Sequence, residues 1–428
     1  MTSHFFKRLW RFLPGCLIAI AVLGLDTVGT YTSLENVFYR WMFHWREPVL
    51  WDDRIALITI DDGTLAELGQ FPFSRGVYAQ LLDQLSDIHP SVIAFNILFI
   101  ESSQADAPLA TAMRQQGHVV IASGLDDQGR ELMPTPLLQE AAIANGHILK
   151  QVESDGLIHI IRPTQANQFA LGITIAEIYN LTRSPVELPP LEEPLWVNWP
   201  GPMAALPQYS LIDVLSGKTD PQVFDDKIVI VGMTATGIDP LLTPYDDNPP
   251  GSGMLLHAAV VDNVLQQRYL RSVPSFWLWG ALLGGMPLMS YFLVTVKLRH
   301  QLLFTVGGVA AWSGIGLILF HSAYLLPMAV PLSAISLTGT AAIIGQRLRE
   351  TLALKRLLEG LWQSYHEDTE DLVNRAAIAP FVPDDLGNEV HKLALLAVSL
   401  SRSQTTQTAI AQTVPLGLLA SDERDQIW

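Results

Sequence analysis

Three long apolar segments near the C-terminal end limit what this chain can fold into more than any other feature. They occupy residues 275–295, 302–320 and 324–344, and none of them contains Asp, Glu, Lys or Arg. Each is about 20 residues long, the length at which an α-helix crosses about 30 Å of hydrocarbon. Three such helices joined by very short loops are not typical of a soluble core. The sequence therefore predicts a multi-pass membrane protein in a lipid bilayer.

A fourth, shorter apolar segment lies near the N-terminus, at residues 13–25. We interpret it as an uncleaved anchor, because a signal-peptidase-like sequence at 19–21 lies inside the apolar run. A cleaved signal would leave three crossings and the same orientation. Short-loop Lys and Arg mark the cytoplasmic side, which predicts both termini in the cytoplasm and residues 32–273 outside it. The basic residues that set this orientation are Lys7, Arg8, Arg11, Lys297, Arg299, Arg347, Arg349, Lys355 and Arg356.

The region 32–273 has the pattern of a mixed α/β domain. Apolar runs at 54–60 and 91–100 flank an amphipathic helical segment at 77–88, and similar alternation continues toward the closing helix at 255–266. Such alternation is typical of βαβ units, so we predict a three-layer α/β domain with a mostly parallel sheet. Residues 33–46, with apolar residues at helical spacing, are expected to extend the first membrane helix outward as a stalk.

Charge and cysteine content restrict the partners and the folding of this domain. The region carries essentially the whole net charge of −16, although charged residues make up only 16% of the chain. An acidic surface repels phosphates, so nucleic acid is excluded as a partner. Cys16 is the only cysteine, so no disulfide can form within the chain and the domain depends on its own core.

Six motifs follow one another in the outer region and carry a family resemblance. They are ITIDDGTLAELGQFPFSRGVYAQLLDQL (58–85), VIAFNILFIE (92–101), DGLIHIIRP (155–163), VNWPGP (197–202), FDDKIVIVGMTATGIDPLLTPY (224–245) and GMLLHAAVVDNVLQ (253–266). Together they resemble the second class of CHASE domains, extracytoplasmic sensors of bacterial cyclases, histidine kinases and Ser/Thr kinases. The resemblance covers about 34–265 and includes the three following apolar segments.

The resemblance implies a signal receptor in the bacterial inner membrane that binds an unknown extracytoplasmic ligand. Two positions depart from the family pattern. Asn96 stands where an Asp is expected, and His159 stands where an Arg is expected. Both changes weaken a charge-based ligand site, so neither residue is taken as a ligand contact.

The C-terminal part is expected to lie in the cytoplasm as a helical linker at residues 346–407. Leu354, Leu358, Leu361 and Tyr365 alternate at spacings of four and three, a coiled-coil register that favours a homodimer; a solvated amphipathic helix is the alternative. Residues 408–428 resemble the opening strand and turn of a PAS domain, which is much longer than this segment. We therefore expect the output domain to be missing. The remaining predicted boundaries are 1–31 for the N-terminal tip and first membrane helix, and 274–345 for membrane helices two to four.

Polar residues at the ends of predicted strands form the candidate ligand site. In open α/β sheets, ligands bind at the carboxyl ends of the strands. The alternative is that these residues cap helices and loops, since Asp before a helix is a common cap. The candidates are Asp61 and Asp62 after the first strand, Thr234, Thr236 and Asp239 after the strand at 227–231, and Arg75 as a charge partner.

Enzymatic chemistry finds no support in the motifs. The segment IDDGTL at 60–65 resembles the DxDGTL loop of haloacid dehalogenase phosphatases, but Ile60 occupies the nucleophile position and an alkyl side chain cannot attack phosphorus. The loop 232–237 lacks the Lys-Ser/Thr pair of a phosphate-binding loop. The histidines show no metal-ligand spacing. We therefore expect no catalytic residue, no metal and no cofactor.

Three functions remain, and the receptor input module is the leading one. The second is a channel or transporter, which is disfavoured because the apolar segments lack the charged residues that coupling sites use. The third is an extracytoplasmic hydrolase, which is disfavoured by the missing nucleophile.

Overall fold

The structure is a computed structural model that describes residues 11–247 and 251–373. It divides into one compact unit that ends at Gly339 and a second that begins at Thr340. The part of the predicted linker beyond residue 373 and the PAS-like segment at 408–428 lie outside the described residues.

A central sheet organises the α/β domain. Within the described residues it has seven strands in the order β10-β1-β11-β2-β3-β4, with β5 also paired to β3. Every pairing among them is parallel except that of β3 with β4, which confirms the prediction of a mostly parallel sheet. The strands are β1 Ile55–Ile60, β2 Val92–Leu98, β3 Val119–Leu125, β4 Glu131–Leu132, β5 Ala144–His147, β10 Gln208–Ser210 and β11 Ile228–Met233.

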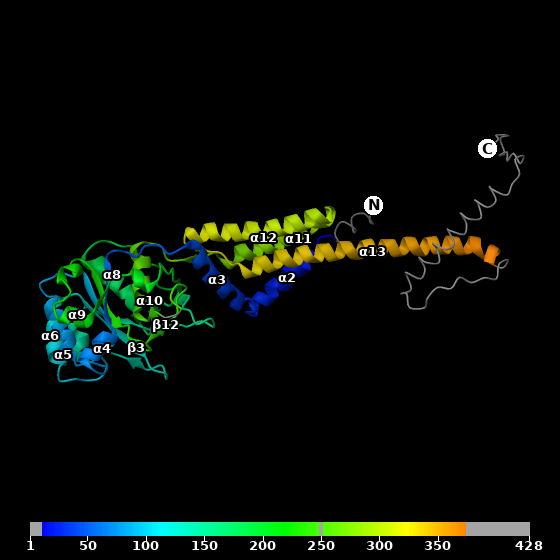
Figure 1. Cartoon of the computed structure of the whole chain (residues 1–428). Coiled ribbons are helices and arrows are strands. Elements are labelled where there is room, and N and C mark those ends of the chain that lie inside the picture. The colour runs from blue at the N-terminus through cyan, green and yellow to red at the C-terminus, as the bar shows by residue number, and fades with distance from the viewer. Residues whose placement is uncertain (1–10, 248–250, 374–428) are drawn as a thin grey trace, which may run out of the picture. The chain divides into compact units, whose positions relative to one another are not determined.

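Helices cover both faces of this sheet (Figure 1). Successive residues of a strand point to opposite faces, so on β1 Ile55 and Leu57 join one hydrophobic core while Ile58 and Ile60 join the other. The first core is closed by α8 and α10, and the second by α5, α6 and α7. Burial on both faces explains why the strands read as continuous apolar runs. The helices are α5 Arg75–Gln84, α6 Asp106–Gln116, α7 Pro136–Ala141, α8 Leu171–Thr182 and α10 Met254–Leu265.

The sequence pattern missed several short elements. The helices α4, Asp62–Leu68, and α9, Leu211–Leu215, were not predicted, nor was the edge strand β10. Within the motif at 155–163, Ile160–Ile161 forms a strand that pairs in a short ribbon, and Leu157 makes a single bridge to Leu242. The two-residue ribbons are β6 Ile160–Ile161 with β9 Leu195–Trp196, β7 Thr164–Gln165 with β8 Gln168–Phe169, β12 Pro240–Leu241 with β13 Gly251–Ser252, and β14 Arg271–Ser272 with β15 Tyr324–Leu325.

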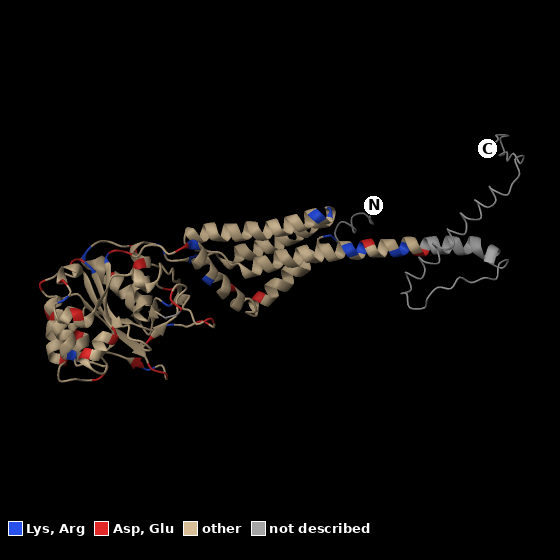
Figure 2. Cartoon of the chain, viewed as in Figure 1, with Lys and Arg blue, Asp and Glu red and all other residues tan. Residues whose placement is uncertain are grey.

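Three of the described helices are long and apolar enough to cross a membrane: α11 Ser275–Thr295, α12 Leu298–His321 and the Ala329–Glu359 part of α13, which runs from Ala329 to Val373. Charged residues gather at the start of α12 and in α13 beyond residue 346 (Figure 2). The predicted start of the last segment at residue 324 is wrong. Tyr324–Leu325 pairs with β14 instead, and Pro327, which cannot donate a backbone hydrogen bond, precedes the helix.

The first apolar segment forms α2, Leu13–Thr27, and residues 32–46 form a separate helix α3, Thr32–Arg46. The two are bent by 88° at a short break, so the expectation of a continuous stalk is wrong. Gly29 lies in the break with φ of +79°, a conformation outside the right-handed helix that glycine adopts without strain. Counted as one span, the bent pair would bring the number of crossings to four.

Candidate functional site

The predicted strand-end site brings two of its members into contact. Strands β1 and β11 are parallel neighbours with Ile60 opposite Met233, so the segments that follow them leave the sheet side by side. Asp62 accepts hydrogen bonds from the backbone N–H of Thr236, 3.1 Å away, and from the Thr236 hydroxyl, at 2.8 Å. This contact is exposed, so a solvent-borne ligand could reach it.

Asp61 has the structural role that the alternative interpretation assigned to it. It is the N-cap of α4, and its Oδ1 accepts from the backbone N–H and the hydroxyl of Thr64, at 2.8 and 2.7 Å, and from the hydroxyl of Ser210 at 2.9 Å. Burial raises the pKa of a carboxyl, but these hydrogen bonds outweigh it and hold the pKa of Asp61 below its usual range.

The other candidates have partners of their own. The Arg75 guanidinium lies 3.4 Å from the Asp106 carboxylate and donates to the Glu101 carbonyl at 3.1 Å. Asp239 forms an ion pair with Lys150. The backbone N–H of Thr234 donates to the carbonyl of Ile60 at 2.9 Å. The contact between Asp62 and Thr236 is thus the part of the predicted site that the structure assembles, and a ligand role for the six residues stays a prediction.

Replacing Asp61 and Asp62 separately distinguishes a cap from a ligand contact. We expect Asp61→Ala to lower the free energy of unfolding by about 0.5–2 kcal/mol, because it removes the oxygen that caps helix α4. Asp62→Ala should cost about 1 kcal/mol or less, since its hydrogen bonds are exposed. Denaturant titration of the full chain in detergent measures both. A larger loss for Asp62→Ala than for Asp61→Ala would contradict this assignment.

Sequence reasoning missed a buried polar network near the C-terminal end of α10. Asp262 is fully buried and receives two hydrogen bonds from the Arg268 guanidinium, at 2.5 and 2.8 Å, and one from the backbone N–H of Asp52 at 2.9 Å. Burial raises the pKa of Asp262, while the Arg268 charge opposes that shift. The signal was present in the sequence: an Asp-Asn pair interrupts α10, whose other residues are apolar except for His257.

This network also holds the end of α3. Asn198 and Asn263 exchange two hydrogen bonds of 2.8 and 2.7 Å, and the Asn198 amide donates to the Arg268 carbonyl at 2.5 Å. Arg46, the last residue of α3, donates to the Asn198 side chain and, at 2.7 Å, to the Trp199 carbonyl. We call Arg46, Asn198, Asp262, Asn263 and Arg268 the exit network, because both chain connections from the domain to the apolar helices meet there.

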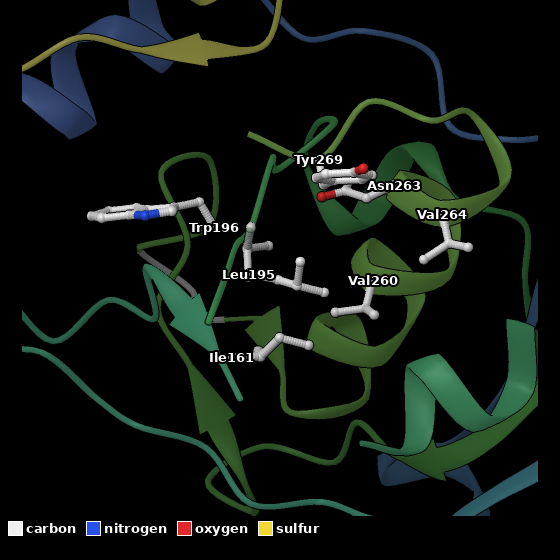
Figure 3. A pocket seen from close by; sticks show the side chains of 8 residues that line it. Ile161, Leu195, Trp196, Val260, Asn263, Val264 and Tyr269 are labelled. Atoms are coloured by element: carbon white, nitrogen blue, oxygen red, sulfur yellow. The ribbon is translucent and has the colours of Figure 1, made fainter. Parts of the chain in front are cut away.

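A small hollow lies beside the exit network (Figure 3). Its lining is apolar apart from the Asn263 amide and the polar edges of its aromatic rings, so it offers no cluster of charged groups for a substrate. Among the side chains that the structure describes, in residues 11–247 and 251–359, no three His, Cys, Asp or Glu group as metal ligands. The lining residues are Ile161, Leu195, Trp196, Val197, Val260, Asn263, Val264 and Tyr269.

Two buried histidines lie on the α8–α10 side of the domain. His147 ends β5 and is 2% exposed; His257 lies on α10 and is 4% exposed. Burial, with smaller contributions from the nearby His147 and Lys150, lowers the pKa of His257 to about 3. Burial also lowers the pKa of His147. Both imidazoles are therefore neutral at ordinary pH.

These features define a mixed α/β domain with a mostly parallel sheet, joined at both ends to apolar helices. The family model of the CHASE2 domain matches residues 17–292, more than half of the chain, and the chain belongs to that family of sensor domains. The match includes most of α2, all of α3 and most of α11, and so confirms the resemblance to CHASE domains seen in the motifs. No curated protein and no solved structure matches the chain.

Proposed function

We propose that the chain is the input module of a transmembrane signal receptor. In this proposal the CHASE2 domain binds a ligand or responds to a stress outside the bacterial inner membrane, and both chain termini lie in the cytoplasm. The family, the apolar helices and the basic residues that flank them support this orientation. The chain relays a signal and does not itself catalyse a reaction, since Ile60 occupies the position that a phosphatase nucleophile would need.

The observation that carries the proposal is the exit network. Arg46 ends the helix that follows α2, and Arg268 precedes β14 and α11 by a few residues. Both residues bind Asn198, Arg46 through its guanidinium and Arg268 through its carbonyl. A shift of the segment around Asn198 would therefore act on two membrane connections at once. Coupling of this kind requires a packed element that both sites can bias.

We propose further that the receptor is a homodimer that pairs through α13. That helix includes the register of Leu354, Leu358, Leu361 and Tyr365, and in the chain alone Leu354 is 58% exposed. An exposed leucine at an apolar position of a heptad pattern favours pairing with a second helix. Changes at the exit network would then alter the contact between the two copies of α13.

Disulfide cross-linking of α13 tests this proposal in the full chain. With Cys16→Ser as background, Leu354→Cys in membranes should form a cross-linked dimer on oxidation. Adding Asn198→Ala should change the cross-linking rate by about twofold or more, as a coupling of about 0.5 kcal/mol requires. Lys218→Ala, which removes only the exposed pair with Asp213, serves as the matched control and should leave the rate unchanged. Absence of the dimer, or equal rates for Asn198→Ala and the control, would contradict the relay.

A further inference from the structure

Helix α3 has an apolar stripe that no described residue covers. Leu34, Val37, Trp41 and Trp45 follow one another at spacings of three and four, and each leaves 43–55% of its surface exposed. Trp41 makes ring contacts with Trp45 and with the half-buried Phe38, which continues the same stripe. An exposed patch with two adjacent tryptophans is unusual in water and marks an interaction surface.

The opposite face of α3 is fixed to the rest of the chain. Tyr39, Met42 and Phe43 are buried in the core that α8 and α10 share. The Tyr39 hydroxyl donates to the Val197 carbonyl at 2.9 Å, and the Phe43 ring packs edge-on against Phe320 at the end of α12. The exposed stripe therefore points away from the domain and is not part of its hydrophobic core.

The length of α2 indicates what covers the stripe. Its 15 residues span about 22 Å, less than the roughly 30 Å of a hydrocarbon core. Leu17 and Ile20 on α2 are 58 and 62% exposed, as expected of lipid-facing positions. Because α2 is too short to cross alone, the next apolar surface along the chain must supply the remaining depth, and that surface is the stripe of α3.

Contacts with the other apolar helices place α3 beside their domain-proximal ends. The Glu35 carboxylate accepts from the backbone N–H groups of Met328 and Ala329, at 3.0 and 2.8 Å, where α13 begins. It thereby satisfies helix N–H groups that would otherwise lack partners. Phe276 and Trp277, both 66% exposed, lie in the first turn of α11. Aromatic residues at helix ends are typical of a membrane interface.

We propose that α3 is embedded in the lipid leaflet nearest the CHASE2 domain, with Leu34, Val37, Trp41 and Trp45 against acyl chains. In this arrangement α2 and α3 together complete the first crossing, and the domain is held directly on the bilayer without a stalk. The partner of this surface is lipid rather than a second copy of the chain, because the stripe continues the lipid-facing surface of α2. The inference holds whichever side of the membrane the domain occupies.

Nitroxide accessibility in the full chain tests the embedding. With Cys16→Ser as background, Val37→Cys and Leu34→Cys would be spin-labelled in vesicles of phosphatidylcholine and phosphatidylglycerol. Gln128→Cys, at an exposed position in the loop after β3, is the water-exposed control. We expect labels at 34 and 37 to collide with oxygen in preference to a water-soluble nickel complex, and the label at 128 to show the reverse.

Two other results would overturn the proposal. Preference for the nickel complex at 34 and 37 would show that the stripe faces water. Dipolar broadening at these positions that disappears on dilution with unlabelled chain would show that a second copy covers it. Both substitutions replace exposed side chains on the same face of α3. If one variant fails to fold, the label in the other variant still measures the accessibility of the stripe.

Discussion

Replacing Arg268 with alanine is expected to lower the free energy of unfolding by about 3 kcal/mol or more, because it leaves a buried carboxylate without its charge partner. Asp262 is fully buried and receives both of its charged hydrogen bonds from Arg268. The Arg268 side chain itself is 23% exposed, so the loss should lie at the lower end of the range for buried ion pairs. Denaturant unfolding of the full chain in detergent measures it.

The surface pair of Lys218 with Asp213 provides a matched control. Its charged atoms are also close, at 3.0 Å, but the two side chains are 71 and 43% exposed. Lys218→Ala should therefore cost about 1 kcal/mol or less. The double variant Asp262→Asn with Arg268→Ala should regain part of the stability that Arg268→Ala loses, since it no longer buries an unpaired charge. Equal losses for Arg268→Ala and Lys218→Ala would refute the exit network as a buried charge network.

Acidification should destabilise the domain through His257. Its pKa is about 3 in the folded chain and near 6.5 in the unfolded chain, so between these values only the unfolded state binds the proton. Folding stability is therefore intact above about pH 6.5 and falls by about 1.4 kcal/mol for each unit below it. The lowered pKa of His147 acts in the same direction. From pH 6.5 to 4.5 we expect His257 alone to remove about 2 kcal/mol.

Comparison with His257→Gln isolates this effect from the other titrating groups. The variant cannot take up the proton at that position, so its free energy of unfolding should fall less steeply over the same pH range. The difference between the two slopes is the quantity to measure, by denaturant unfolding at a series of pH values. Parallel slopes for the chain and its His257→Gln variant would mean that the buried histidine does not titrate on unfolding.

The sheet could be predicted because its strands are buried on both faces. Such strands appear as apolar runs in any register, as β1, β2 and β11 do, and parallel order follows from the helices between them. The short strand β10 lacks that signal. Its residues Gln208–Ser210 are exposed or half-buried, so only backbone pairing with β1 defines it.

Only part of the candidate site could be predicted from the sequence pattern. The strand-end rule correctly placed Asp62 beside the loop that holds Thr236, because the rule depends on sheet topology alone. It could not separate Asp61 as a cap, since that role depends on the unpredicted helix α4 and on Ser210 of β10. For α3, periodicity identified an apolar face but gave no information on what covers that face.

A receptor input module requires its α/β domain and the C-terminal part of α13 to lie on opposite sides of the membrane. A reporter that is active only in the cytoplasm would be fused after Arg349 in one chain and at Gln128 in another. Arg349 lies in α13, and Gln128 lies in the α/β domain between β3 and β4. An input module with an outward CHASE2 domain predicts activity after Arg349 and none at Gln128. Activity at Gln128 and silence after Arg349 would contradict it.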